Sequence, residues 1–430
     1  MGNLIKFELK KIFQNKLCFA VIILVLIGSL ALTGYNLSQY KSGVRGEYAL
    51  SDMDGRKMPE VFVSNENIEA LKARLDEFEA NDEIYTTSEE VKKELVYVNG
   101  VAKNPYKCEY NGKYEFDLGE IINKYEAGEI TEEEYLSIIQ NNDDLPFIRL
   151  EYLPEYFELY APVKEYNQQI NGIKELRETA NSAKGTVDEK IYLHKAEVIE
   201  KSLEEGFTYG YDYGWESAFC SFSDGTISLL LVAVVIMGVC NLFSNEYSYR
   251  TAELIIVSKN GKKKTVSAKI IASVIYAVIC SLVFCAIVFS VNFAFLGADG
   301  MNVGVGISNL ERACVSIPFV TLGCIIIALL SLAVSSLFSK PVISTFGALF
   351  IGFFPMILNF YVLLEEPLET LTKITPIMMI CGNYITYDEF IVIGENVLSI
   401  VTMFIPVSIL LFVLTSVISM VKFCKYQVKN

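Results

Sequence analysis

The residue types that most often carry out chemistry form no catalytic pattern in this chain of 430 residues. The single histidine, His194, lies in a charged stretch with a helical pattern, where a surface position is usual. The closest approach to a phosphate-binding loop is NGKKKT at 260–265, which lacks the upstream glycine and the Gly-Lys-Ser/Thr order. HExxH and GxSxG motifs are absent. We therefore expect a chain that is not an enzyme by itself and that holds no catalytic residue, cofactor or metal.

The ten cysteines include no CxxC pair, which argues against a zinc site or a thioredoxin-like centre. Most of them lie in apolar runs, where cysteine behaves as a small hydrophobic residue. Cys108 and Cys220 lie in a long polar segment. A disulfide between these two and a pair of unpaired thiols are both open.

The chain combines 52% hydrophobic residues with a net charge of −15, and one soluble globule does not explain both. So acidic a chain is a poor candidate for nucleic-acid binding, which needs clustered lysine and arginine. Six apolar segments are long enough to cross a bilayer as helices, which takes about 20 residues. Prolines interrupt the last three. The six segments are 17–36, 225–243, 270–296, 313–337, 341–364 and 396–421.

The segments between these spans differ in charge in a way that orients the chain. One side has 14 basic and 3 acidic residues and comprises 1–16, 244–269, 338–340 and 422–430. The other side has 22 basic and 48 acidic residues and comprises 37–224, 297–312 and 365–395. Because cytoplasmic loops are enriched in lysine and arginine, we expect both termini, including the basic tail, in the cytoplasm. The expected location is a bacterial plasma membrane.

The leader, residues 1–16, has one apolar helix face and three lysines away from it. This pattern predicts an amphipathic helix in the inner membrane interface, with an ordinary basic flank as the alternative. The face consists of Ile5, Leu9, Ile12 and Phe13. The first span could also be a signal peptide cleaved after Ala31, although its apolar run is longer than usual.

Residues 37–224 form one insertion between the first two spans, expected to be an extracellular domain of α+β or mainly α class. Helical patterns cover 65–82 and 164–205, the latter broken near 181–185. Alternating stretches, ELVYVNGVA and YKCEYNGKYEF, predict short strands. The acidity of the domain either attracts a cationic substrate or only reflects the exclusion of lysine and arginine from this side. An aromatic group ahead of the second span is typical of a membrane interface: Tyr209, Tyr211, Tyr213 and Trp215.

The cytoplasmic segment 244–269 has a distinctive order of residues. Glu246 is followed by Thr251, Leu254, the basic turn SKNGKKK and Lys269 just before the third span. In this order, in the leader and in the short turn SSLFSKP between the fourth and fifth spans, the chain resembles ABC-2 type transporter permeases. Their loop often has a glycine where this chain has Arg250.

The resemblance implies the permease subunit of an ATP-driven exporter. It would pair with an identical or related permease and with two ATPase subunits, which bind ATP and magnesium. A short cytoplasmic helix would transmit the motion of the ATPase. We place this coupling helix at 246–257, with Glu246 and Arg250 as a supporting pair four residues apart. The expected ATPase-coupling residues are Glu246, Arg250, Thr251, Glu253 and Leu254.

The stretch LTKITPIMMICGNYI at 371–385 is apolar but too short to cross a membrane twice. The resembling family has a re-entrant helical hairpin here, which Pro376 and Gly382 would suit, and an interfacial loop is the alternative. The predicted spans carry no charge, which argues against an ion-coupled pump. Polar residues within them are candidates for a pathway, although hydrogen bonding between helices explains them equally well. These are Asn241, Asn292, Thr321 and Asn359.

Two functions of different class follow. The first is a permease that moves an amphipathic substrate (a peptide, a lipid or an antimicrobial compound) out of the cytoplasm. The second is a membrane-anchored receptor or scaffold whose acidic outer domain binds an extracellular ligand. An ATPase in the purified complex would separate the two.

Overall fold

The computed structural model describes most of the chain beyond residue 153 and parts of the segment before it. The described residues are 1–14, 60–79, 154–223, 225–257, 261–361, 368–382, 389–394 and 396–425, with short stretches at 23, 27–28, 34, 85–86, 96–98, 101–103, 107–110, 114–116, 124, 127–131 and 147–148. Most of the predicted first span at 17–36 lies outside this part, and so does the side chain of Cys108. The first span therefore stays a prediction, and a disulfide between Cys108 and Cys220 and a pair of unpaired thiols both stay open.

Five helices in the described part are long and apolar enough to cross a membrane. The first, Ile227–Ser248, combines α10 (Thr226–Val239), a turn and α11 (Ser244–Ser248). The others are α13 (Lys263–Leu296), α14 (Asn309–Leu337), α15 (Pro341–Tyr361) and α19 (Ile400–Cys424). The chain is thus a mostly helical, multi-pass membrane protein. The prolines predicted to interrupt the last three spans lie inside α14, α15 and α19.

Two predicted span boundaries are wrong. The third helix begins at Lys263 instead of residue 270, because the stretch KKTVSAK contains no glycine or proline to end it. Lys269 therefore lies inside the helix. Residues 396–399 are not helical but form strand β10 (Asn396–Ser399), which pairs antiparallel with β9 (Phe390–Ile393). Hydropathy cannot separate this apolar strand from the helix that follows it.

Close packing between α10 and α13 depends on a small residue opposite a large one. Tyr276 of α13 is fully buried, and its hydroxyl donates to the carbonyl of Val234 at 2.9 Å. A Cβ atom at Gly238 of α10 would lie 2.3 Å from the Tyr276 ring, so only glycine fits. The buried core of the bundle continues through α14, which packs against α13, α15 and α19.

The segment predicted as a re-entrant hairpin contains α16 (Leu368–Lys373) and α17 (Pro376–Cys381). Pro376 is the first residue of α17, and Gly382 ends it in the left-handed conformation, with φ 69°. Every residue of α17 is buried, and the helix packs against α14 at Gly323. The two breaks are where the sequence predicts them. Re-entry from the outer side of a membrane stays a prediction.

The described residues between 60 and 209 form a second body. Helix α3 (Ile68–Glu79) packs against a helical hairpin of α7 (Pro154–Ser182) and α8 (Val187–Glu205). The break between α7 and α8 confirms the one predicted near 181–185. Strand β1 (Val61–Val63) pairs antiparallel with β8 (Phe207–Tyr209) beside them. A four-stranded sheet, β2–β7–β5–β6, and a hairpin consist of short strands: β2 (Tyr85–Thr86), β3 (Val96–Val98), β4 (Val101–Lys103), β5 (Lys107–Tyr110), β6 (Tyr114–Phe116) and β7 (Phe147–Ile148). These elements confirm the mixed α and β content.

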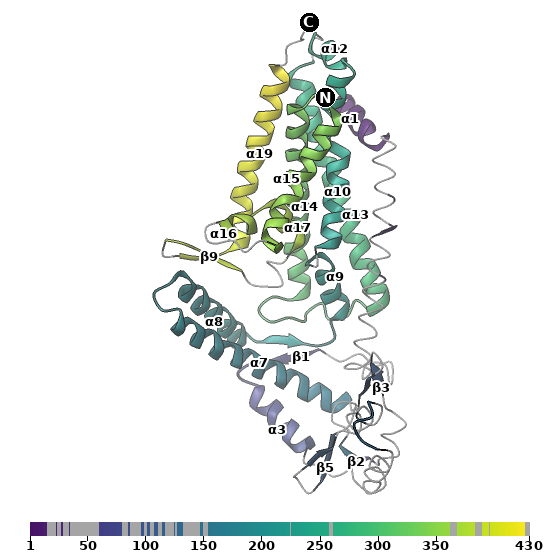
Figure 1. The fold of residues 1–430 in the computed structure, drawn as a ribbon. Coiled ribbons are helices and arrows are strands. Elements are labelled where there is room, and N and C mark those ends of the chain that lie inside the picture. The colour runs from purple at the N-terminus through teal and green to yellow at the C-terminus, as the bar shows by residue number, and fades with distance from the viewer. Residues whose placement is uncertain are drawn as a thin grey trace.

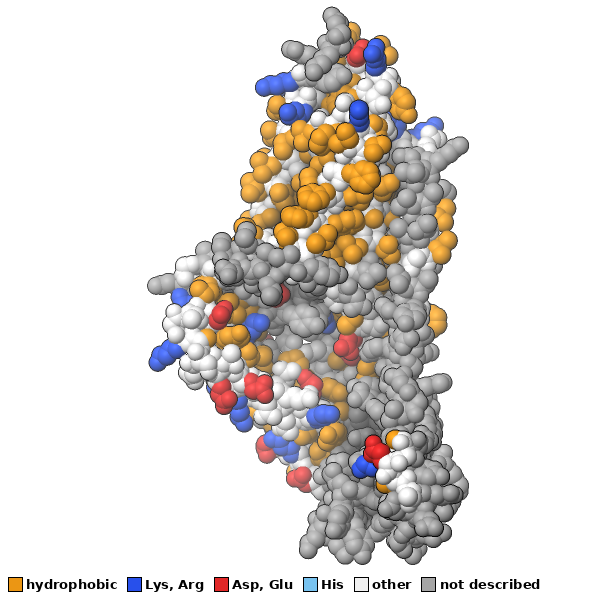
Figure 2. Space-filling view, in the orientation of Figure 1, with side chains coloured by type: hydrophobic (Ala, Val, Ile, Leu, Met, Phe, Trp, Pro, Cys, Tyr) orange, Lys and Arg blue, Asp and Glu red, His pale blue; other side chains and the backbone are white. Residues whose placement is uncertain are grey.

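The second body lies at the end of the bundle opposite to α1 (Gly2–Gln14) and the C-terminal end of α19 (Figure 1). Helix α9 (Tyr213–Ser223) joins the two parts and packs against α13. Tyr211 donates to the carbonyl of Leu296 at 2.7 Å, and the Trp215 indole donates to that of Ala298 at 3.1 Å. The lone histidine, His194 of α8, packs edge-on against Phe390 of β9. Figure 2 shows a broad hydrophobic band over the helices, with basic side chains beyond it at the α12 end.

Candidate functional site

The predicted coupling helix is two helices with a sharp break between them. Helix α11 ends at Ser248, and α12 (Thr251–Val257) begins after Tyr249 and Arg250. Arg250 has φ 55°, a left-handed conformation that favours glycine. The predicted pair between Glu246 and Arg250 is therefore wrong, because a continuous helix would be needed to hold them one turn apart.

Glu246 instead pairs with two lysines beneath the break. Its Oε1 accepts from Lys269 Nζ at 2.7 Å and from Lys11 Nζ at 2.8 Å. Glu8 of α1 completes the group, with Oε2 at 2.9 Å from Lys269 and Oε1 at 3.1 Å from Lys11. We call these four residues the charge cluster. It joins α1, α11 and α13, which are far apart in the sequence.

The charge cluster is electrically balanced, and all of it except Lys11 is buried. Lys269 is fully buried, and Glu8 and Glu246 are at most 5% exposed, whereas the Lys11 side chain is 33% exposed. Two ammonium groups offset two carboxylates, as a buried ionic group requires. Burial lowers the pKa of Lys11, but the attraction of Glu246 and Glu8 outweighs it, so that this pKa lies above its usual value. Lys269 lies just before the predicted span at 270–296, which itself carries no charge, and α13 extends past that apolar run to include it.

One sign of the cluster is visible in the sequence. Glu8 lies three residues after Ile5 and four before Ile12, on the apolar face of α1. In the structure this face packs against the bundle, and Ile12 is almost fully buried. A lone carboxylate on such a face needs a partner. The sequence alone does not say that the partner is Lys269, 261 residues away.

Three exposed apolar side chains cover the break and α12. Tyr249 and Leu254 are each 76% exposed, and Val257 is 87% exposed. Arg250 and Thr251 are exposed between them, and Glu253 is half-buried. We call Tyr249, Leu254 and Val257 the exposed patch. The patch lies on α12 and on the break before it, and α12 is at the tip of the molecule (Figure 1).

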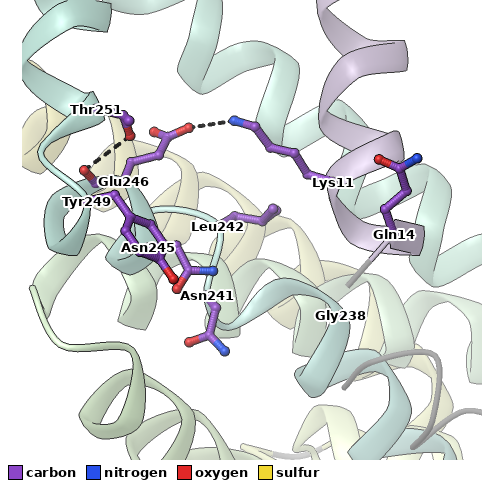
Figure 3. Close-up of a pocket in the computed structure, with 9 residues that line it drawn as sticks. All are labelled: Lys11, Gln14, Gly238, Asn241, Leu242, Asn245, Glu246, Tyr249 and Thr251. Atoms are coloured by element: carbon purple, nitrogen blue, oxygen red, sulfur yellow. Dashed lines mark hydrogen bonds and ion pairs between the residues drawn. The ribbon is translucent and has the colours of Figure 1, made fainter. Parts of the chain in front are cut away.

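A polar cavity of about 360 Å³ lies between α1 and the turn after α10. Lys11 and Gln14 border it on one side and Asn241, Asn245 and Glu246 on the others (Figure 3). The hydroxyl of Thr251 donates to the carbonyl of Glu246 at 3.3 Å. This bond ties the start of α12 to the residue at the centre of the charge cluster.

The four predicted pathway residues do not meet at one site. Asn241 accepts from Thr345 of α15 at 3.3 Å, and Asn359 of α15 donates to Thr372 of α16 at 3.1 Å. Asn292 of α13 accepts from Ser217 of α9 at 2.7 Å, and Thr321 of α14 lies 3.1 Å from the Ser281 hydroxyl of α13. Each residue therefore bonds to a different neighbouring element. Helix–helix hydrogen bonding accounts for all four.

Among the described residues, no group of three or more histidine, cysteine, aspartate and glutamate side chains is arranged to hold a metal ion. The site thus consists of the charge cluster, the exposed patch and the cavity between α1 and α11. Such an arrangement connects a surface to a membrane helix.

Comparison with known proteins gives one result. The family model described as ABC-2 family transporter protein matches residues 16–422, which is nearly the whole chain. No curated protein and no solved structure matches it. The matched family is a membrane transport component, and membership implies a partner ABC ATPase. The chain therefore belongs to the ABC-2 family of transporter proteins.

Proposed function

We propose that the chain is the permease of an ATP-driven exporter that moves an amphipathic peptide, lipid or antimicrobial compound out of the cytoplasm. Family membership supports the permease role. The observation that carries the proposal further is the exposed patch, which is joined through Thr251 and Glu246 to α13 and α1. ATP and magnesium would bind on the partner ATPase, with two copies in each complex.

The exposed patch is suited to an ATPase that docks on it. Leu254 and Val257 present large apolar surfaces at the end of the bundle, and such surfaces are typical of protein interfaces. Arg250, Thr251 and Glu253 supply polar contacts around them. Glu246 is buried and does not contact the ATPase in this proposal. Its role in coupling is to hold the break between α11 and α12 against α13.

Motion of the docked ATPase reaches the membrane through the charge cluster. A displacement of α12 moves Glu246, whose carboxylate is held by Lys269 of α13 and Lys11 of α1. Separating these charges in a buried site is costly, so the three helices move together. The switch is a rigid-body one, in which α13 tilts with the cytoplasmic helices.

A second permease is proposed to pack on α15. This helix has a stripe of exposed large side chains at spacings of three and four residues, while its opposite face carries buried Ser344 and Ala348. The stripe consists of Ile343, Phe346, Phe350, Phe354 and Ile357. Such a stripe suits contact with an equivalent helix in a dimer.

Export is tested with inside-out membrane vesicles that contain the permease and its ATPase. We expect a fluorescent amphipathic probe to accumulate inside them when ATP is added, because their cytoplasmic face is outward. Right-side-out vesicles with ATP supplied only outside serve as the control and should not accumulate it. ATP-driven uptake into right-side-out vesicles loaded with ATP would instead reverse the proposed direction. A receptor or scaffold would give no ATP-dependent movement in either preparation.

A further inference from the structure

An apolar groove lies outside the charge cluster, in the half of the bundle next to the second body. Its volume is about 550 Å³, and it is bordered by α9, α13 and α14. On α13 the lining runs from Leu282 to Phe293, and on α14 from Leu310 to Pro318. These residues belong to two helices that are long and apolar enough to span a membrane.

Small residues open the groove between large ones. Ala286 of α13 and Ala313 of α14 line it, together with the larger Phe289 and Ile317. Phe289 and Ile317 also border a second cavity of only about 20 Å³. The groove's lining residues Leu282, Ala286, Leu310 and Cys314 are exposed, so the groove opens on the surface of the bundle.

The groove offers an occupant almost no polar partner. Its lining includes the weakly polar thiols of Cys285 and Cys314, and the indole N–H of Trp215 already donates to the carbonyl of Ala298. An extended polypeptide backbone in the groove would leave its amide groups without hydrogen bonds, which is costly inside a membrane. An unfilled apolar space is also unfavourable, because its lining loses dispersion contacts. A hydrocarbon chain has no amide groups that need hydrogen bonds, and it fills the apolar space.

A cation lies beside the groove. Arg312 stands between the lining residues Leu310 and Ala313 in the sequence, and its guanidinium lies 4.4 Å from the ring centre of Phe219, which borders the smaller cavity. Its positive charge opposes the rise that burial causes in the pKa values of Asp212 and Glu216 in the neighbouring segment. A phosphate at the membrane surface would be attracted to this guanidinium.

We infer that the groove holds one acyl chain of a phospholipid from the outer leaflet, with the phosphate beside Arg312. The lipid would be a fixed part of the junction between α9, α13 and α14. It is distinct from transported cargo, and the inference depends on the membrane location of the chain and not on the direction of transport.

The test uses the full chain in lipid nanodiscs that contain a phosphatidylcholine with a photoreactive group in one acyl chain. After illumination, the crosslinked peptides are mapped by mass spectrometry. We expect crosslinks concentrated in 282–293 and 310–318. Ala286→Phe fills the exposed mouth of the groove and should abolish them. Ile279→Phe, two turns away on the same helix and exposed, adds a similar side chain outside the groove and should keep them.

A photoreactive diacylglycerol, which lacks the phosphate, tests the role of Arg312. Arg312→Gln should weaken crosslinking of the phospholipid and leave that of diacylglycerol unchanged. Equal crosslinking in Ala286→Phe and wild type, or equal yields along α15, would overturn the inference. Loss of the lipid during ATP turnover with the partner ATPase would mark it as cargo and would also overturn the inference.

Discussion

The ammonium of Lys269 lies 2.7 Å from Glu246 Oε1, in a place where the lysine has no exposure to solvent. The contact joins the second turn of a membrane helix to the last turn before the exposed break between α11 and α12. Because Lys11 and Glu8 balance the two charges, the contact is stable only as part of the whole cluster.

Lys269→Met leaves Glu8 and Glu246 with a single cation between them. Loss of one partner from a buried ionic group costs roughly 3–5 kcal/mol, so we expect a large drop in the thermal unfolding temperature of the detergent-purified chain. The additional change Glu8→Gln removes the carboxylate left over and should restore part of the loss. Lys10→Met, on the exposed side of α1, is the control and should have little effect. Equal stabilities of Lys269→Met and Lys10→Met would refute the importance of the cluster.

Glu216 of α9 gives the stability of the chain a pH dependence. Burial raises the pKa of Glu216, and the neighbouring Asp212 raises it further, while Arg312 opposes the shift. A carboxyl whose pKa is higher in the folded state binds its proton more tightly there, so stability falls as pH rises from the usual pKa of 4.5 to the raised value. Glu216→Gln should flatten this part of the curve of unfolding temperature against pH. An unchanged curve would contradict the placement of this carboxyl.

A substitution at Gly323 tests how the buried helix α17 packs against α14. A Cβ there would lie 2.7 Å from the carbonyl oxygen of Pro376 and equally close to Ile380, so Gly323→Ala must displace α17. We expect lower thermal stability, by about 1–3 kcal/mol. Gly172→Ala is the matched control, because a Cβ at this position of α7 meets nothing within 4 Å. Alanine there should stabilise the helix by about 1 kcal/mol. If both variants change thermal stability in the same direction, this packing of α17 against α14 is contradicted.

Two substitutions of Arg250 test the conformation of the break between α11 and α12. Its left-handed backbone costs a residue with a Cβ about 1–2 kcal/mol, which glycine avoids. We expect Arg250→Gly to keep or slightly raise thermal stability, and Arg250→Val to lower it, since a β-branched residue adopts this conformation poorly. Circular dichroism melting curves provide the comparison. A loss of stability in Arg250→Gly that matches Arg250→Val would mean that the side chain, not the backbone, matters.

Local patterns predicted much of the fold because they depend on residues close in the sequence. The apolar face of α1, the break between α7 and α8 and the breaks around α17 follow from periodicity and from residues such as Pro376 and Gly382. The site was less predictable. The pairing of Glu246 with Lys269 depends on how α11 packs on α13. The break between α11 and α12 could not be predicted, because the residue that adopts the left-handed conformation there, Arg250, gives no turn signal.

The central claim is that the exposed patch docks the partner ATPase. The most direct measurement is co-purification of that ATPase with the tagged chain from membranes. We expect wild type and Leu193→Asp, an exposed position on α8 at the opposite end, to retain it. Leu254→Asp places a charge in the docking surface and should lose it while the permease stays folded. If Leu254→Asp binds as much ATPase as wild type, or if wild type binds none, the account is contradicted.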